Sequence, residues 1–369
     1  MQHLRLIADD LTGALDTAAQ FTARLGSIPV FWPGRIPDRL PPSAAIDTGT
    51  REEGEAVAVR ATARLASILA PEPGKLSYFK LDSLLRSRPS AALGALLHAL
   101  APRHCIIAPA FPFQRRITRG GCQYVQGPNG WTPTGENLPA ALAAQGFAVS
   151  LAHPGDLVPE GVSVWDAESH ADIARIAAAG RSLVEPVLWC GTAGLAGALA
   201  QTSPGAPLGS PPSIALSRPL LGLFGSDHPV TTTQLRTAAR HHLPLLDESA
   251  AEAAAAISAR VAATGVALIS FSLPPGIPRA AAGERISRAI AALLARVARP
   301  AALIAAGGET LRAVCAALEA THLEVSGQLM PGIPRSLLRG GRWDLLPVIS
   351  KSGAFGSESL LAELTAPPA

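Results

Sequence analysis

Residues 4–26 read LRLIADDLTGALDTAAQFTARLG, and two adjacent acids, Asp9 and Asp10, divide this stretch. The apolar run at 4–8 before them is typical of a buried strand. After them, apolar residues recur at intervals of three and four as far as Gly26, which predicts a helix that ends at a glycine. A strand that leads directly into a helix is the first part of a right-handed βαβ unit, so the stretch predicts a mostly parallel sheet.

Short apolar runs alternate with helical patterns along the rest of the chain in the same way. This alternation predicts further βαβ units. The other expected strands lie at 28–32, 43–47, 77–81, 104–110, 147–152, 162–167 and 186–190, and then at 220–226, 243–247, 266–272, 302–308 and 346–350.

Residues 203–219, SPGAPLGSPPSIALSRP, separate the two series of strands. Their proline- and glycine-rich composition is typical of a linker between domains. We therefore expect an α/β protein of two α/β domains with mostly parallel sheets. The predicted N-terminal domain spans 1–205, and the predicted C-terminal domain spans 206–369.

Composition and charge exclude several classes of protein. Hydrophobic residues make up 48% of the chain and charged residues 16%, so a large core can form and disorder is not expected. The net charge of +3 does not indicate a nucleic-acid or membrane partner. No run of ~18 residues is apolar enough to span a bilayer, and acids at positions 9 and 10 interrupt any signal-peptide pattern. The four cysteines form no CxxC pair, which is typical of free thiols in a reducing compartment and predicts a cytoplasmic protein.

Polar side chains follow three of the expected strands in the first half. Ligands of open parallel sheets bind at the carboxyl ends of the strands. The first strand end is acidic, whereas the ends after 77–81 and 104–110 carry cations and hydroxyls. Such a mixture suits a small anionic polyol, because Arg can bind a carboxylate through two hydrogen bonds and Asp can orient or deprotonate a hydroxyl. The candidate residues are Asp10 for catalysis and Asp9, Lys80, Asp82, Ser83, Arg86, Arg116 and Thr118 for substrate binding.

Glycine-containing turns follow three of the expected strands in the second half. Glycine turns at helix N-termini bind anions through backbone N–H groups, as in phosphate sites. None of them matches GxxxxGK[ST] or GxGxxG, but three in one domain favour a nucleotide site. The candidate nucleotide-binding residues are Ser226, Gly307, Gly308, Glu309, Thr310, Lys351, Ser352 and Gly353.

Each of these patterns has a purely structural alternative. Asp10 could only cap the helix that follows it, a role that Asp favours. Gly307 and Gly308 could form only a tight turn, and Arg115, Arg116 and Arg119 could lie on a solvated loop. No metal-ligand spacing such as HExxH occurs, so no residue is assigned to a metal.

The motifs occur in an order that resembles the four-carbon acid sugar kinases. The resemblance runs from about residue 4 to residue 361 and rests on the whole ordered set. The matching segments are IADDLTGALD, KLDSLLRS, PAFPFQRRITRGG, WDAESHADI, CGTAGLAGAL, GSDHPVTTTQL, AAGGETL, MPGIP and SKSGAFG.

This resemblance implies an enzyme that phosphorylates a threonate, erythronate or oxo-tetronate type of acid. It implies that the N-terminal domain binds the acid sugar and that the C-terminal domain binds ATP. Mg²⁺ would bridge the phosphates, and closure of the domains would exclude water. Asp10 would be the base or hydroxyl-orienting group, with Asp9 as the alternative. Arg86 and Arg116 would hold the carboxylate, and Lys80 would add positive charge.

Two other classes of function stay open at this point. A non-catalytic protein that binds nucleotide or sugar acid is one alternative, because the sequence departs from the family pattern at Leu84, Arg115, Ile117 and Gln328. A Rossmann-like oxidoreductase is less favoured, because it would need GxGxxG with an acid about 20 residues further on. The sequence names neither the sugar acid nor the oligomeric state, and a homodimer is one option.

Overall fold

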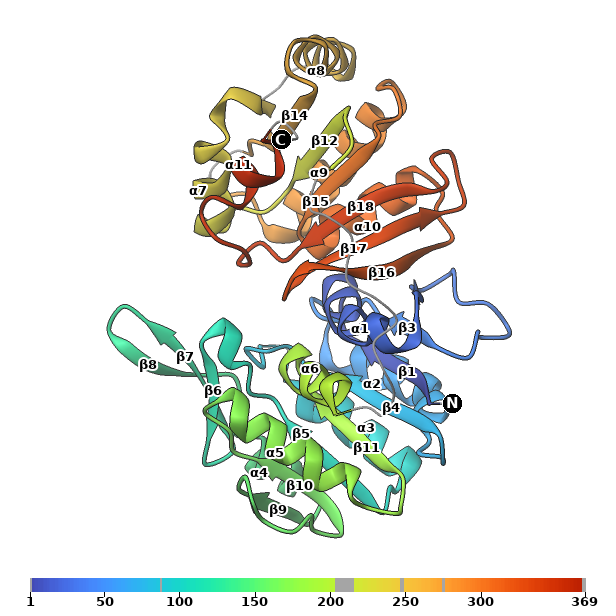
Figure 1. Ribbon diagram of the computed structural model, residues 1–369, viewed down its shortest axis with the longest axis vertical. Coiled ribbons are helices and arrows are strands. Elements are labelled where there is room, and N and C mark those ends of the chain that lie inside the picture. Colours follow the sequence, from blue (N-terminus) through green and yellow to red (C-terminus); the bar gives the residue numbers. More distant parts are fainter. Residues whose placement is uncertain (1, 87, 203–215, 246–248, 274–275, 367–369) are drawn as a thin grey trace. The chain divides into compact units, whose positions relative to one another are not determined.

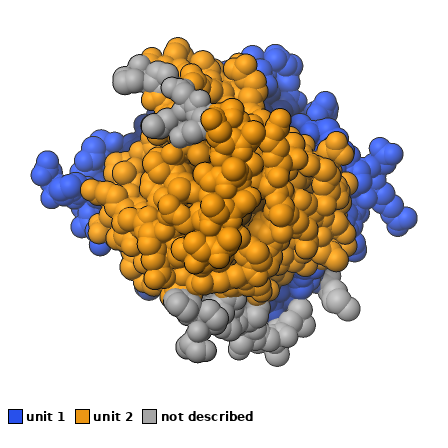
Figure 2. Space-filling model, turned by 90° about the horizontal axis from the view of Figure 1, so that it is seen from above, with its two compact units in different colours: residues 1–209 blue, residues 210–369 orange. Residues whose placement is uncertain are grey.

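The computed structural model describes residues 2–86, 88–202, 216–245, 249–273 and 276–366. The chain forms two compact units, unit 1 at Met1–Gly209 and unit 2 at Ser210–Ala369, which Figure 2 colours separately. The domain boundary predicted between residues 205 and 206 lies outside the described residues. The predicted fold class, two α/β domains with mostly parallel sheets, is confirmed.

The main sheet of unit 1 is entirely parallel, and its strand order is β2-β3-β1-β4-β11-β5-β10-β9. Strands β5 and β11 near its centre are largely apolar and are buried along their whole length, as expected where helices cover both faces. Every strand expected in the first half belongs to this sheet. The strands are β1 (His3–Ala8), β2 (Ile28–Phe31), β3 (Ala44–Asp47), β4 (Lys75–Lys80), β5 (His104–Ala108), β9 (Val149–Ala152), β10 (Gly161–Trp165) and β11 (Val187–Gly191).

The helices of unit 1 pack in two groups on the sheet (Figure 1). Helices α1, α5 and α6 form one group, and α2, α3 and α4 form the other. The apolar stripe predicted for residues 11–25 is buried on α1. The helices are α1 (Leu11–Leu25), α2 (Glu55–Leu65), α3 (Pro89–Leu100), α4 (Leu138–Ala143), α5 (His170–Arg181) and α6 (Ala193–Gln201).

A small antiparallel sheet follows β5 in unit 1 and was not expected from the sequence. It consists of β6 (Arg116–Arg119), β7 (Cys122–Gly127) and β8 (Gly130–Thr134), paired in that order. Isolated bridges join β6 to Phe111 and to Ala167. The small sheet therefore carries the predicted residues Arg116 and Thr118 on a strand, whereas the sequence places them on a loop.

The sheet of unit 2 has the order β13-β14-β12-β15-β18-β17-β16, in which only the pairings of β17 are antiparallel. The hairpin β16–β17 was not expected, whereas the five parallel strands were. The strands are β12 (Leu220–Phe224), β13 (His242–Leu245), β14 (Val266–Phe271), β15 (Ala302–Ala306), β16 (His322–Met330), β17 (Ile333–Arg339) and β18 (Leu346–Lys351).

The helices of unit 2 also pack in two groups. Helices α8, α9 and α10 pack in sequence on one another, and α11 packs on α7. Among the described residues there is no helix whose length and hydropathy would let it span a bilayer. The helices are α7 (Pro229–Thr237), α8 (Ala250–Thr264), α9 (Arg279–Leu294), α10 (Gly308–Ala317) and α11 (Leu360–Leu364).

Candidate active site

Asp10 caps the first helix of unit 1. It follows β1 and stands at the N-cap of α1 with an extended backbone (φ −145°, ψ 157°). Its Oδ1 accepts a hydrogen bond from the Gly13 N–H at 2.9 Å, and its Oδ2 accepts one from the Thr12 hydroxyl. Asp10 therefore caps the helix, which was the structural alternative considered from the sequence. Capping also fixes the carboxylate at the edge of the sheet where α/β proteins bind their ligands.

Arg51 joins the two adjacent acids. It follows β3, the strand next to β1, and its backbone N–H donates to the Asp9 carbonyl at 3.1 Å. Its Nη2 and Nε donate to both oxygens of Asp9 at 2.6 and 3.1 Å, and Nη2 lies 2.7 Å from Asp10 Oδ1. The same nitrogen is 4.0 Å from Asp82 Oδ1. Burial tends to lower the pKa of Arg51, but the three carboxylates raise it well above its ordinary value. One guanidinium thus offsets the repulsion between the acids.

Arg51 is absent from the residues predicted above. The rule that polar strand ends mark a ligand site could have found it, because Asp47, Thr48 and Thr50 precede it after a buried strand. Glu52, Glu53 and Glu55 follow it, and acids of this kind are common at the start of a helix. The segment therefore resembles an ordinary helix start, and no separate feature of the sequence selects Arg51.

Lys80 lies beside the same carboxylates. It ends β4, it is buried, and its Nζ donates to the Leu81 carbonyl at 2.6 Å. A Cβ placed on Gly13 would collide with the Asp10 carboxylate and would lie 3.3 Å from Lys80 Nζ and 3.5 Å from Arg51 Nη2. Gly13 is therefore the point at which three charged groups converge. Burial and then the Arg51 charge lower the pKa of Lys80, whereas the acids oppose that change.

Asp82 and Arg86 form a paired unit in the turn after β4. Arg86 Nε and Nη2 donate to the two Asp82 oxygens at 2.7 and 2.9 Å, and the Arg86 backbone N–H adds a third bond at 3.1 Å. Burial raises the pKa of Asp82, but the hydrogen bond from Arg86 and the charges of Arg51, Arg86 and Lys80 outweigh it and hold the pKa well below its usual range. Asp82 is 3% exposed, whereas the Arg86 side chain is 54% exposed. Asp82 is therefore an ionised anchor, and Arg86 faces solvent.

Ser83 and Arg116 contact each other at the next position. Arg116 Nη1 donates a hydrogen bond to the Ser83 hydroxyl, and the guanidinium is buried. Burial lowers the pKa of Arg116 to about 10, and the Asp82 charge opposes that change. A partly desolvated cation of this kind gains from a bound anion, because low dielectric strengthens the attraction.

Thr118 is linked to Ser83 indirectly, through the side chain of Gln123. It is fully buried, and its hydroxyl donates to Gln123 Oε1 at 2.8 Å. Gln123 Nε2 in turn donates to the carbonyls of Ser83 and Pro109, each at 3.0 Å. In this structure Thr118 braces the Ser83 turn through Gln123, and its predicted contact with substrate stays a prediction.

In unit 2, the three predicted glycine turns lie at adjacent strand ends. They follow β12, β15 and β18, which are neighbours in the parallel part of the sheet. The Gly307 N–H donates to the Lys351 carbonyl at 2.9 Å. A Cβ on Gly353 would collide with the Ser226 hydroxyl, and a Cβ on Gly225 would collide with the Thr310 hydroxyl. The next neighbours of these two Cβ positions lie only 3.1–3.2 Å away, so the turns pack closely around the glycines even if the hydroxyls rotate.

Helix α10 begins at this edge. Its N-cap is Gly307 with φ 100°, a conformation that favours glycine, and no side chain caps the helix. The first-turn N–H groups of a helix attract anions through hydrogen bonding and the helix dipole. Glu309 in that turn is largely exposed, with Oε1 3.9 Å from Arg312 Nε. Gly308 and Thr310 complete the turn.

Lys351 is a buried lysine at the same edge. It is 1% exposed, and its Nζ donates to the Thr231 hydroxyl at 3.1 Å and to the Gly353 carbonyl at 3.3 Å. The Thr231 hydroxyl donates to the same carbonyl at 2.8 Å. Burial lowers the pKa of Lys351 to about 7, because the charged form loses its hydration. Ser352 follows it in the turn.

Comparison with known proteins divides the chain in the same way. A family described as a sugar-binding N-terminal domain matches residues 4–154, and one described as a nucleotide-binding C-terminal domain matches residues 221–361. A D-threonate kinase from Cupriavidus necator is 33% identical and aligns over 96% of this chain and 95% of its own. A 3-oxo-tetronate kinase from Methylobacterium radiotolerans is 27% identical over 96% of each chain. A solved structure from Salmonella typhimurium shares the fold, with a TM-score of 0.71, 21% identity and 98% coverage of both chains.

Proposed function

The chain belongs to the four-carbon acid sugar kinase family, and we propose that unit 1 holds the acid sugar while unit 2 holds the ATP that phosphorylates it. The protein is a kinase of four-carbon acid sugars, as its relatives are. The assignment of the acid sugar to unit 1 and of ATP to unit 2 rests on the contrast between the two strand-end sites. One is a cluster of carboxylates and cations, and the other is a set of glycine turns at a helix N-terminus.

In unit 1, we assign the substrate hydroxyl to Asp10. Phosphoryl transfer passes through a loose transition state, so positioning matters more than covalent chemistry. Arg51 binds both oxygens of Asp9, whereas among the described residues Asp10 Oδ2 accepts a hydrogen bond only from the rotatable Thr12 hydroxyl. A substrate hydroxyl that donates to Asp10 Oδ2 would be oriented by it, and its proton could pass to that oxygen.

The substrate carboxylate would meet the cationic side of the cluster. Arg86 uses Nε and Nη2 on Asp82, and a guanidinium has further N–H donors on Nη1. Arg86 is exposed, while Arg116 and Lys80 are buried. We infer that Arg86 binds the carboxylate first and that Arg116 and Lys80 supply positive charge from within.

In unit 2, the nucleotide phosphates would lie along the turns that carry Ser226, Gly307 and Gly353. Backbone N–H groups at the start of α10 would bind them. The described residues include no group of three or more His, Cys, Asp or Glu side chains placed to hold a metal ion. Mg²⁺ that arrives on ATP keeps phosphate oxygens and waters as its main ligands, where it would neutralise charge on the transferred group.

An ATP-consumption screen tests the proposed function. Threonate, erythronate and their 2- and 3-oxo forms are offered with ATP and Mg²⁺, and ADP release is followed. We expect one or more of these acids to be phosphorylated. If ATP binds to the protein and none of the acids is turned over, the chain is a binding protein and the kinase assignment fails.

Gly353 gives a test of the nucleotide site. Changing Gly353→Ala places a Cβ on the Ser226 hydroxyl and within 3.1–3.2 Å of the Cβ atoms of Ser226 and His228. The turn must then shift even if the hydroxyl rotates, and ATP affinity should fall by about tenfold or more. Gly283→Ala is the matched control, because a Cβ there meets nothing within 4 Å. Calorimetric titration with ATP compares the two variants with the wild type. Equal ATP affinity in all three would contradict the assignment of this turn.

Lys351 predicts a pH dependence of ATP binding. Its pKa of about 7 means that it loses charge as pH rises through neutrality, whereas bound phosphates favour the charged form. ATP affinity should therefore decline between pH 7 and 9, by at most about tenfold per pH unit, with proton uptake on binding. Titrations in two buffers of different ionisation enthalpy measure that uptake.

The Lys351→Met variant should lose the pH dependence. His228 is a neighbouring titratable side chain, because its Cβ lies 3.2 Å from a Cβ placed on Gly353. The titration is therefore repeated in His228→Asn, which should keep the wild-type slope. An affinity that is flat from pH 7 to 9 in the wild type would refute the role of Lys351.

A further inference from the structure

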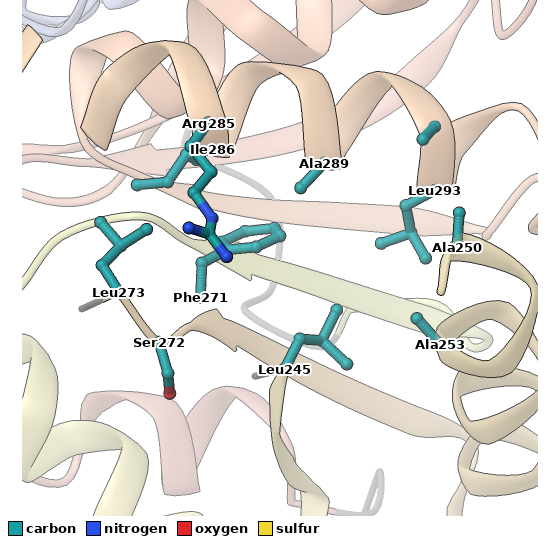
Figure 3. Close-up of a pocket in the computed structure, with 11 residues that line it drawn as sticks. Leu245, Ala250, Ala253, Phe271, Ser272, Leu273, Arg285, Ile286, Ala289 and Leu293 are labelled. Atoms are coloured by element: carbon teal, nitrogen blue, oxygen red, sulfur yellow. The ribbon is translucent and has the colours of Figure 1, made fainter. Parts of the chain in front are cut away.

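Unit 2 contains a cavity of ≈ 180 Å³ that none of the roles above uses. It lies among the carboxyl ends of β13 and β14, the start of α8 and one side of α9 (Figure 3). Most of the side chains that line it are apolar. They include Leu245, Ala253, Phe271, Ile286, Ala289 and Leu293.

The cavity adjoins the first of the glycine turns. Ile286 lines the cavity, and its Cγ2 lies 3.2 Å from a Cβ placed on Gly225. Gly225 follows β12, and β12 pairs directly with β14, whose end forms another wall. The same Cβ on Gly225 would collide with Thr310 at the start of α10. One continuous path along the sheet edge therefore leads from the cavity to the turns that would hold the phosphates.

The size and chemistry of the cavity suit a flat aromatic ring. A cavity of roughly 150 Å³ holds benzene, so ≈ 180 Å³ has room for a heterocycle, while the sugar and phosphates of a nucleotide would extend beyond it. Phe271 from β14 and Arg285 from α9 both extend into it (Figure 3). Planar aromatic and guanidinium groups stack on planar rings.

We propose that this cavity binds the nucleobase of the phosphate donor, as a purine held mainly by packing. The proposal rests on the proposed function, because it needs the phosphates of the same nucleotide to lie on the glycine turns. Among the residues that line the cavity, Ser272 and Arg285 have polar side chains. Packing on apolar walls discriminates weakly between rings of one shape, whereas a fully hydrogen-bonded site discriminates strongly.

This proposal predicts a phosphate donor that is selected as a purine nucleotide. GTP should replace ATP with a kcat/KM within about tenfold, since the walls offer little to reject the altered ring substituents. CTP should be poorer than both, because a single ring leaves part of the cavity empty. Discrimination of more than a hundredfold between ATP and GTP would overturn the packing-based selection.

Ala289→Trp tests the position of the base. Ala289 lines the cavity, yet it is exposed, so a larger side chain can fill the space with little cost in folding. Ala291→Trp on the exposed face of the same helix is the matched control. The binding of ATP and of inorganic tripolyphosphate is measured by calorimetry for both variants and the wild type. We expect Ala289→Trp to weaken ATP at least tenfold and to leave tripolyphosphate within about twofold, while Ala291→Trp changes neither.

The tripolyphosphate titration distinguishes the proposed base site from the proposed phosphate site on the glycine turns. Unchanged ATP affinity in Ala289→Trp would overturn the cavity assignment while leaving the phosphate turns intact. Equal weakening of ATP and tripolyphosphate would also overturn it, because the substitution would then be distorting the turns. If neither probe binds to the wild type, the nucleotide role of unit 2 fails, and the cavity assignment fails with it.

Discussion

Changing Asp10→Asn should lower kcat by about 10²- to 10⁴-fold, the range that a positioned acid–base group contributes, with ATP affinity nearly unchanged. Asparagine cannot take the proton of the substrate hydroxyl, and it lacks the charge that orients that hydroxyl. It remains a good N-cap, so it can still accept from the Gly13 N–H. Arg51 keeps both bonds to Asp9 and loses only the charge of Asp10 at its 2.7 Å contact. The loss should therefore appear mainly in turnover, with a smaller change in thermal stability.

Asp9→Asn is the matched comparison for this experiment. Both Asp9 oxygens accept from Arg51, so its substitution should lower stability more than Asp10→Asn does and should lower kcat less. Steady-state turnover with the preferred acid, ATP titration and thermal unfolding are measured on both variants. Wild-type turnover in Asp10→Asn would remove the assigned role, and a larger kcat loss in Asp9→Asn would transfer it to Asp9.

The strand-to-helix alternation made the fold predictable from the sequence. Runs such as 105–108, 187–190 and 302–306 are apolar on both faces, which in a parallel sheet covered by helices is the expected pattern. The two antiparallel elements were missed for a common reason. In β7–β8 and in β16–β17, polar residues, glycine and proline interrupt the strands, so neither shows a clean alternation of period two.

Candidate site residues could be proposed from the sequence only where they follow strands that the sequence reveals. Asp10, Asp82 and Lys351 all do so. Arg51 reaches Asp9 across 42 positions of sequence, and such a contact depends on β1 and β3 being neighbours, which no local pattern encodes. The cavity of unit 2 could not be predicted from the sequence for a similar reason. Its walls come from four separate elements and consist largely of ordinary apolar residues, which any buried helix or strand would also contain.

Changing Arg51→Met should lower the free energy of unfolding by about 3 kcal/mol at pH 7, the low end of the cost of removing one partner of a buried ion pair. The side chains of Arg51, Asp9 and Asp10 are 16%, 17% and 13% exposed, so water moderates the loss but does not remove it. Methionine keeps much of the arginine stem, so lost packing contributes little. Asp9, Asp10 and Asp82 would then share the site with the cations Lys80, Arg86 and Arg116.

The pH dependence identifies the cause of that loss. In the wild type the pKa of Asp82 lies well below its usual range, so the stability it contributes is present above pH 4 and declines only as pH falls further. Without Arg51, crowded carboxylates bind a proton more readily when folded than when unfolded, so the variant should gain stability as pH falls from 7 to 5.

Urea unfolding of the wild type, Arg51→Met and Arg51→Lys at both pH values measures this. Arg51→Lys should recover part of the loss, because it restores the charge without the two-pronged contact with Asp9. A deficit in Arg51→Met that stays the same at pH 5 and 7 would instead indicate lost packing and would contradict the view that Arg51 serves to neutralise the carboxylates.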